Sequence, residues 1–285
     1  MMRIDAHQHF WRLAARRGAW PPPELASIHR DFAPDDLAAL LEQHGIGATV
    51  LVQSLPDEAD TSFMLELADR HQFIAAVVGW VDLKANSAPA RIAAMAAHPK
   101  LRGLRPMLQD LDDDHWIDDP ALSPAVDAML RHGLRLDALV LPRHLQPLLA
   151  FARRHPALPI VIDHIAKPAM GGAPDAQWLQ DMERLAAEPQ VACKLSGMVT
   201  EAGPGWAVEQ LLPYARHVLQ AFGPERVIWG SDWPVVRLAG DYAAWLEGSE
   251  ALLAHLPPAQ QDAVFGLNAL RFYGIKEGTA CTAFT

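Results

Sequence analysis

The fold is decided by Met2-Arg-Ile-Asp-Ala-His-Gln-His-Phe-Trp11, a short run that ends on two histidines. Side chains in a strand alternate between two faces, so this pattern places Asp5, His7 and His9 on one face. Two imidazoles two positions apart then project into the same space, as a metal ion or a polarised carbonyl requires. In a chain with 13 histidines the pair can also arise by chance, so its meaning depends on the rest of the sequence.

Apolar runs rich in β-branched residues recur after this first strand, at 48–53, 75–82, 101–106, 134–140, 159–164, 191–196 and 227–232. Between them, apolar residues repeat at three- and four-residue spacing. This predicts helices near 34–44, 62–71, 88–98, 120–132, 144–155, 175–187, 207–222 and 241–255, and a last one near 258–273. Eight strands, each followed by a helix, are typical of a (β/α)8 TIM barrel, an α/β fold; a doubly wound open sheet is the rival.

The composition is that of an ordinary globular chain, with 51% hydrophobic and 20% charged residues among 285. Barrels of this type commonly use about 250 residues as one unit, so we expect a single domain over 1–275 and a flexible tail over 276–285. The net charge of -10 disfavours nucleic acid or an anionic membrane as a partner.

Two cysteines, Cys193 and Cys281, are too few for a disulfide framework. The start of the chain turns polar at once, so we expect no signal peptide. No apolar run is long enough to span a bilayer. Together these features favour a cytoplasmic protein. The oligomeric state is left open.

The segment Arg12–Asp31 follows the two histidines directly and carries Pro21-Pro22-Pro23. Three prolines exclude a regular helix or a central strand. Long loops in compact domains often cover functional sites, so we expect this loop to cover whatever the histidines bind.

Polar residues stand at the ends of most predicted strands. They are His7 and His9, Trp80 and Asp82, Arg105, His164 with Lys167, Lys194 with Ser196, and Asp232 with Trp233. In a parallel barrel the carboxyl ends of all strands meet at one face, so these side chains would gather around one pocket. An open sheet would spread several of them apart, which favours the barrel.

Several of these motifs together resemble the amidohydrolase superfamily. They are His7-Gln8-His9, Ile162-Asp163-His164, Gly230-Ser231-Asp232-Trp233-Pro234 and the closing segment 265–273, and the likeness covers nearly the whole chain. The segments 79–83 and 101–106 are similar to its sugar-lactonase branch, which includes hydrolases of fucono-, rhamnono- and galactono-lactones and the pyrone dicarboxylate lactonase. The resemblance implies a lactone-opening enzyme of carbohydrate catabolism, with L-fucono-lactone as the leading substrate.

The same resemblance implies that His7, His9 and His164 bind a metal or polarise a carbonyl, with Asp232 as general base. Members with two metals usually have a bridging Lys or Glu on the fourth strand and a His on the fifth. Here those strands carry Arg105 and Asp137, so at most one ion is expected. Zinc suits a set made of His7, His9, His164 and Asp232. Lactonase members that need no metal are known, so the need for an ion stays open.

Ester hydrolysis needs a base for water, positive charge near the carbonyl oxygen and a proton for the leaving oxygen. Asp232 can be the base in a direct attack by water. Arg105, Lys194, Trp80, Trp233 and Lys167 are expected to bind substrate. Two other functions remain: a metal-dependent decarboxylase of an aromatic acid, and a non-catalytic sugar-acid binding protein.

Structural alternatives exist for each main residue. Asp232 can cap the turn after its strand, and His164 can be a buried histidine with satisfied hydrogen bonds. Arg105 can pair with Asp82 or Asp110. The side chain of Lys194 can face either side of the barrel wall.

Overall fold

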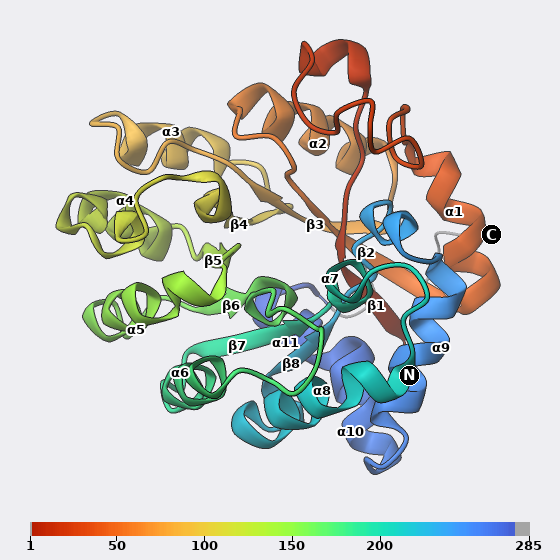
Figure 1. Ribbon diagram of the computed structural model, residues 1–285. Helices are drawn as coiled ribbons and strands as arrows, with labels where there is room; N and C mark the ends of the chain where they lie inside the picture. Colours follow the sequence, from red (N-terminus) through yellow and green to blue (C-terminus); the bar gives the residue numbers. More distant parts are fainter. Residues whose placement is uncertain (1, 277–285) are drawn as a thin grey trace.

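The computed structural model, which describes residues 2–276, contains one parallel sheet of eight strands surrounded by helices (Figure 1). The strands follow one another around the sheet in chain order. They are β1 Arg3–Gln8, β2 Ile46–Val52, β3 Ile74–Gly79, β4 Leu101–Leu104, β5 Arg135–Ala138, β6 Ile160–Ile162, β7 Val191–Leu195 and β8 Val227–Trp229. The predicted (β/α)8 barrel is therefore confirmed. The expected tail, apart from Lys276, lies outside the described residues.

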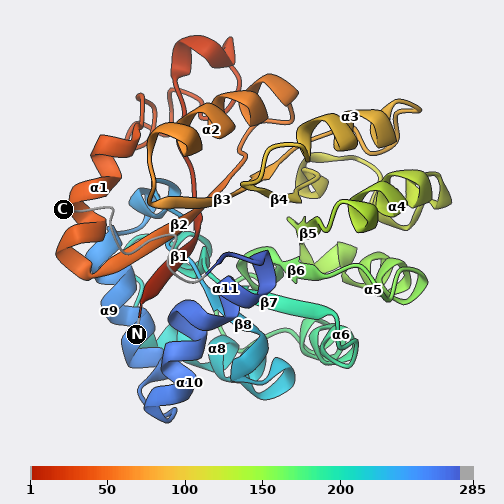
Figure 2. The same cartoon turned by 180° about the vertical axis from the view of Figure 1, so that it is seen from behind.

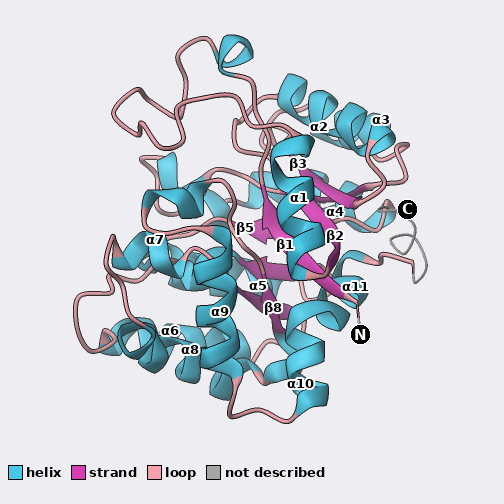
Figure 3. Ribbon diagram, turned by 90° about the vertical axis from the view of Figure 1, so that its right-hand side faces the viewer, coloured by secondary structure: helices cyan, strands magenta, loops and turns pink. Residues whose placement is uncertain are grey.

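The long helices lie on the outside of the barrel, between consecutive strands (Figure 3). The helices are α1 Pro34–His44, α2 Glu58–Arg70, α3 Ala88–Met95, α4 Ser123–Arg131, α5 Leu145–Arg154, α6 Ala176–Ala186, α7 Met198–Ala202, α8 Val208–Phe222, α9 Tyr242–Leu253, α10 Pro258–Asp262 and α11 Asn268–Tyr273. The short helix α7 was not predicted. The helix predicted near 258–273 is divided, because a π-helical segment, Ala263–Leu267, separates α10 from α11. Within residues 2–276 no helix is both long enough and apolar enough to cross a membrane.

Proline, aspartate and glycine residues mark the ends of α1 and α2. Pro34 opens α1, the Asp36 side chain accepts a hydrogen bond from the Ala33 backbone N–H at 2.8 Å, and Gly45 ends the helix with a φ of 66°. Asp57 at the start of α2 accepts from the Ala59 N–H at 2.8 Å. These local contacts define both ends of α1 and the start of α2.

Two apolar clusters hold the barrel together. Side chains on the outer faces of the strands, such as Leu51 and Leu195, pack against the helices. Small or β-branched residues such as Ala6, Val50 and Ala192 fill the lower interior, together with Tyr273 and its neighbours from α11. Helix α11 lies at the base of the barrel, as seen from behind in Figure 2. The opposite end is left for polar side chains.

The ring closes between β1 and the residues that follow β8. The Asp232 backbone N–H donates to the His7 carbonyl oxygen at 2.8 Å, and the His9 N–H donates to the Trp233 carbonyl oxygen at 2.8 Å. Gln8 and Trp233 thereby form a parallel bridge. Closure therefore brings the two histidines of β1 directly beside Asp232.

The expectation that Asp5 shares a face with His7 and His9 was wrong. The register of β1 against β2 shifts between Asp5 and Gln8, which breaks the strict alternation of faces. Asp5 accepts hydrogen bonds from the Ser231 N–H at 2.8 Å and the Ser231 hydroxyl at 2.6 Å, and from the Tyr242 hydroxyl of α9 at 3.3 Å. It therefore fastens the end of β8 to β1 from outside the barrel.

Burial raises the pKa of Asp5 from 3.8 to about 6, against the opposing effect of its hydrogen bonds to Ser231. Since the folded protein keeps this proton longer than the unfolded chain, the stability contribution is full below about pH 4 and is lost as pH rises to about 6. A shift of this size corresponds to about 3 kcal/mol. We predict that wild type loses this stability relative to Asp5→Asn between these pH values, as measured by urea unfolding. Parallel pH profiles for the two proteins would contradict the assignment.

Candidate active site

A pocket of about 510 Å³ opens at the carboxyl ends of the strands. This volume lies within the range usual for small-molecule sites. Its polar wall contains His9, Arg105, His164, Lys167 and Asp232, which follow β1, β4, β6 and β8. The barrel thus brings together side chains that are up to 223 residues apart in sequence.

Asp232 lies at the centre of three imidazoles. Its Oδ1 is 3.2 Å from His9 Nε2, 3.8 Å from His7 Nε2 and 3.9 Å from His164 Nε2. All four residues are at most 5% exposed. The three histidines predicted to form the reactive centre with Asp232 therefore surround one of its carboxylate oxygens.

The backbone on either side of this centre is in an uncommon conformation. Asp232 has a φ of 57°, and the run His164–Lys167 contains four consecutive non-glycine residues with positive φ. Such residues cost of order 1–3 kcal/mol each unless the surroundings impose them, and they concentrate at functional sites. Here the run turns the chain so that both His164 and Lys167 reach the pocket wall.

The Nδ1 atoms of His9 and His164 each have a hydrogen-bond partner. His9 Nδ1 lies 2.7 Å from the Val52 carbonyl oxygen, and His164 Nδ1 lies 2.8 Å from the Ser196 hydroxyl. Because a carbonyl oxygen only accepts, His9 Nδ1 carries the proton and Nε2 directs a lone pair at Asp232. A lone pair and a carboxylate 3.2 Å apart need a proton or a metal ion between them.

The electrostatics keep this centre as a carboxylate among neutral imidazoles. Burial lowers the pKa of His164 to about 4, with Asp232 opposing the shift. Burial disfavours the Asp232 carboxylate, but His164, His9 and His7 outweigh that cost and hold its pKa below the ordinary value. A base that is ionised at neutral pH is thus in place beside groups that can polarise a bound carbonyl.

A fully buried ionic network lies beneath the pocket. Lys194 Nζ is 2.6 Å from Asp137 Oδ2, 3.0 Å from Asp163 Oδ1 and 3.0 Å from His7 Nδ1. Arg105 Nη1 is 3.2 Å from Asp163 Oδ2, and Nη2 donates to the Gln53 carbonyl oxygen. The partner of Arg105 is therefore Asp163, and neither Asp82 nor Asp110.

Three residues predicted to bind substrate do not line the pocket. Lys194 is 0% exposed and lies under His7. Trp233 packs edge-on against Phe10 and Phe32. Trp80 is held through its backbone N–H by the Thr61 hydroxyl, away from the pocket lining. Arg105 and Lys167 do line it, so the structure brings two of the five to the wall.

Sequence reasoning missed the apolar half of the wall and the carboxylates below it. Trp20, Met107 and Leu139 line the pocket from loops, and Val235 and Leu238 line it from the short 3-10 segment Val235–Leu238, where no long periodicity marks them. Asp163 stood within the Ile162-Asp163-His164 motif, directly before a predicted ligand. Asp137 is a carboxylate in a strand that is otherwise mostly apolar. A buried carboxylate needs a charged or hydrogen-bonding partner, and this was the only sequence signal for the network.

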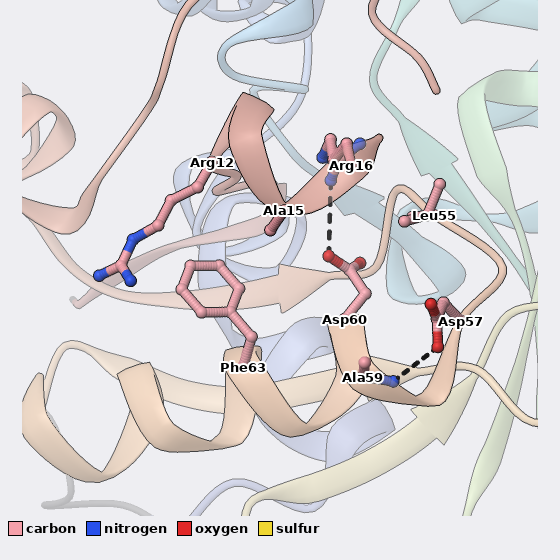
Figure 4. Close-up of a pocket in the computed structure, with 8 residues that line it drawn as sticks. All are labelled: Arg12, Ala15, Arg16, Leu55, Asp57, Ala59, Asp60 and Phe63. Atoms are coloured by element: carbon pink, nitrogen blue, oxygen red, sulfur yellow. Dashed lines mark hydrogen bonds and ion pairs between the residues drawn. The ribbon is translucent and has the colours of Figure 1, made fainter. Parts of the chain in front are cut away.

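The loop over 12–31 reaches the pocket through Ala19 and Trp20, as its position predicted. Arg16 anchors it: the guanidinium donates to the Trp20 carbonyl at 2.9 Å and to the Ser54 hydroxyl at 2.6 Å. The same group lies 3.5 Å from Asp60 of α2, in a contact drawn in Figure 4 beside Arg12 and Phe63. The cover is thus fixed to the barrel by a buried arginine in its short 3-10 segment, Leu13–Arg16.

The central cluster fits a single metal ion. Two groups of three residues each have ligand atoms that all lie within 4.8 Å of one another. One is His7 with His9 and Asp232, and the other is His7 with Asp163 and His164. Nitrogen and oxygen donors at this spacing suit zinc coordination. The lone pair of His9 opposite Asp232 is an independent reason to place positive charge there. The cluster is therefore a candidate metal site.

Comparison with known proteins identifies the family. Residues 4–275 match a family model described as Amidohydrolase. This chain belongs to the amidohydrolase family. The resemblance inferred from the strand-end motifs is thus confirmed.

Curated amidohydrolase relatives support the lactonase branch. The chain is 57% identical over 277 residues to a protein named L-fucono-1,5-lactonase from Burkholderia ambifaria, with 96% of each chain covered. A protein of the same name from Burkholderia multivorans is 38% identical over 97% of each chain. A solved amidohydrolase structure from Burkholderia multivorans with bound zinc has a TM-score of 0.89 and 37% identity, and covers 97% of this chain and 100% of its own.

Glycine at 197 leaves room for the ring of His164. It has a φ of 65°, and a Cβ there would lie 2.6 Å from His164 Nδ1. We predict that Gly197→Ala displaces the imidazole and lowers hydrolytic kcat/KM about 100-fold, because misplacement by about 1 Å costs that much. Steady-state kinetics and a crystal structure of the variant test this. Gly205→Ala is the matched control, because its φ of 81° is also positive and a Cβ there meets nothing within 4 Å. Equal losses in both variants would refute the prediction.

Proposed function

We propose that this amidohydrolase opens the ring of a sugar lactone of the aldonic acid class, with L-fucono-1,5-lactone as the leading substrate. The name shared by relatives 57% and 38% identical over nearly the whole chain supports this substrate. The arrangement of an ionised Asp232 among three imidazoles carries the reaction type, because it unites a base with groups that polarise a carbonyl. The reaction would belong to L-fucose catabolism.

The proposed reaction is direct attack by water. Asp232 removes a proton from water while the oxygen bonds to the lactone carbonyl carbon. The carbonyl oxygen gains negative charge, which donors at the imidazole cluster and Arg105 stabilise. The bond between this carbon and the ring oxygen then breaks, and Asp232 returns its proton to the departing oxygen. No covalent enzyme intermediate is needed.

Arg105 and Lys167 are proposed to bind substrate oxygens, because both line the pocket and offer several N–H donors. The opposite side of the pocket is apolar and contains Trp20, Met107 and Leu139. A sugar derivative with a methyl group in place of one hydroxymethyl group fits such a pocket, because its hydroxyl groups can contact the polar side and its methyl group the apolar side. This agrees with a 6-deoxy lactone as substrate.

A metal ion, if bound, would be held by His7, His9, His164 and Asp232, and zinc suits these ligands. It would supply Lewis-acid polarisation of the carbonyl. The chain's own residues remain sufficient to orient the lactone and to move the proton. Whether the ion is required is decided by activity after chelation.

The two alternatives from the sequence gain less support. Both a decarboxylase of aromatic acids and a non-catalytic sugar-acid binding protein are compatible with the fold, yet two full-length relatives are named lactonases. A screen of sugar lactones with a pH indicator, run with chelator and with added zinc, distinguishes all three. Acid release from L-fucono-1,5-lactone supports the proposal, whereas release of carbon dioxide from an aromatic acid or saturable binding without turnover overturns it.

We predict that Asp232→Asn lowers kcat about 10²- to 10⁴-fold, the usual contribution of a general base. Asparagine tolerates the positive φ at this position, so the fold should be retained. Kinetics on the lactone and circular dichroism of the variant check the two statements. Asp35→Asn, an exposed change in the first turn of α1, is the control. A rate within a few-fold of wild type would exclude Asp232 as the base.

A further inference from the structure

Lys194, near the carboxyl end of β7, is a lysine with no exposed surface. It has three polar atoms around its ammonium group: Asp137 Oδ2 at 2.6 Å, Asp163 Oδ1 at 3.0 Å and His7 Nδ1 at 3.0 Å. Neither the base nor the substrate wall of the proposed mechanism uses this residue. Its contact with His7 nevertheless connects it to the reacting atoms.

The ammonium group of Lys194 can only donate hydrogen bonds, because it has three hydrogens and no lone pair. It donates to Asp137 Oδ2 at 2.6 Å and contacts His7 Nδ1 at 3.0 Å, whereas Asp163 Oδ1, 3.0 Å away, forms an ion pair without accepting a hydrogen bond. In a dry interior an ammonium hydrogen without an acceptor costs more than an ordinary hydrogen bond contributes. The contact with His7 is therefore favourable only if Nδ1 acts as an acceptor.

This requirement fixes the proton of the neutral imidazole. If Nδ1 carried the proton, two N–H donors would face each other at 3.0 Å. The rival arrangement would have Nδ1 donate to Asp163 at 3.5 Å and Nε2 accept from Arg105 at 3.3 Å, and both distances are longer. Arg105 Nη1 donates one hydrogen to Asp163 Oδ2 at 3.2 Å, and its second hydrogen faces His7 Nε2 at 3.3 Å. Each neutral form of His7 therefore opposes one pair of donors. The Nε2–H form opposes the pair that is farther apart and keeps the shorter contact, from Lys194 at 3.0 Å, and is therefore favoured.

We propose that Lys194 is a positioning residue that holds His7 in the Nε2–H form, so that the imidazole presents a hydrogen-bond donor to the pocket. Nε2 is the atom on the side of Asp232, at 3.8 Å from its Oδ1. In the proposed lactonase reaction, on which this role rests, the N–H donates to the carbonyl oxygen as charge develops there. His9, whose proton lies on Nδ1, cannot supply such a donor from Nε2.

Two uses of His7 then exclude each other. A metal ligand needs a lone pair on Nε2, whereas a donor needs a proton on the same atom. With Lys194 in place, the metal-free protein uses His7 as a donor. A metal ion bound to His7 Nε2 would require the imidazole proton to lie on Nδ1. The hydrogen bond from Lys194 to His7 Nδ1 would then be lost.

The direct test is the position of the proton on His7. Two-bond ¹H–¹⁵N correlation spectra of chelator-treated protein labelled with ¹⁵N-histidine distinguish the two neutral forms, and loss of one signal set in His7→Gln assigns the residue. We expect the Nε2–H pattern in wild type. An Nδ1–H pattern, or an averaged one, overturns the proposal. This measurement needs no Lys194 variant and no substrate, so a negative lactone screen does not affect it.

Lys194→Met removes the three donors and keeps the length of the side chain. We expect its His7 spectrum to move toward Nδ1–H and its kcat to fall about 10- to 100-fold with a smaller change in KM, as for other outer-sphere partners of catalytic histidines. Tyr273→Phe is the matched control, because it removes the hydroxyl that donates to Asp137 at 2.7 Å and does not touch His7. If Lys194→Met keeps the Nε2–H pattern and kcat, or if both variants change alike, the proposal is wrong; if Lys194→Met does not fold, the wild-type spectrum decides.

Discussion

The structure depends on the way the ring of strands is closed. Two backbone hydrogen bonds, from Asp232 to the His7 carbonyl and from His9 to the Trp233 carbonyl, join the first strand to the segment after the last. The residues that close the barrel are therefore the same ones that form its reactive centre. A slip of one residue in this register would turn the histidines away from Asp232, since side chains alternate along a strand. The same pair of backbone hydrogen bonds therefore specifies both the closed barrel and the site.

Below the residues that close the ring, the side chains inside the barrel change from charged to apolar. Its lower part contains small apolar side chains and α11, whereas its upper part contains the cations Lys194 and Arg105 with the carboxylates Asp137 and Asp163. Burying such groups is costly, and hydrophobic replacements of similar volume often stabilise proteins better. A dry core of ion pairs is therefore better explained by what it positions than by the stability it adds. Every member of the network lies one or two contacts from His7 or the pocket.

Much of this architecture followed from the sequence, because periodicity and strand-end polarity are local signals. The eight strands, the long helices and the assembly of His7, His9, His164 and Asp232 were all predictable from them. The face of Asp5 was not, since a register shift within β1 is invisible in an alternating pattern. The side of the wall on which Lys194 lies could not be decided either, because its carboxylate partners come from β5 and from the residue that follows β6. Loop residues such as Trp20 carry no periodic signal at all.

The apolar wall of the pocket comes largely from loops, whereas the polar centre stands at strand ends tied into the closed ring. These two parts of the molecule can diverge at different rates. Changes at Met107, Leu139 or Leu238 can reshape the fit to a new compound without disturbing the carboxylate and its imidazoles. Gene duplication followed by sequence change in the segments that form the apolar wall would therefore yield enzymes that share one reaction mechanism and differ in substrate.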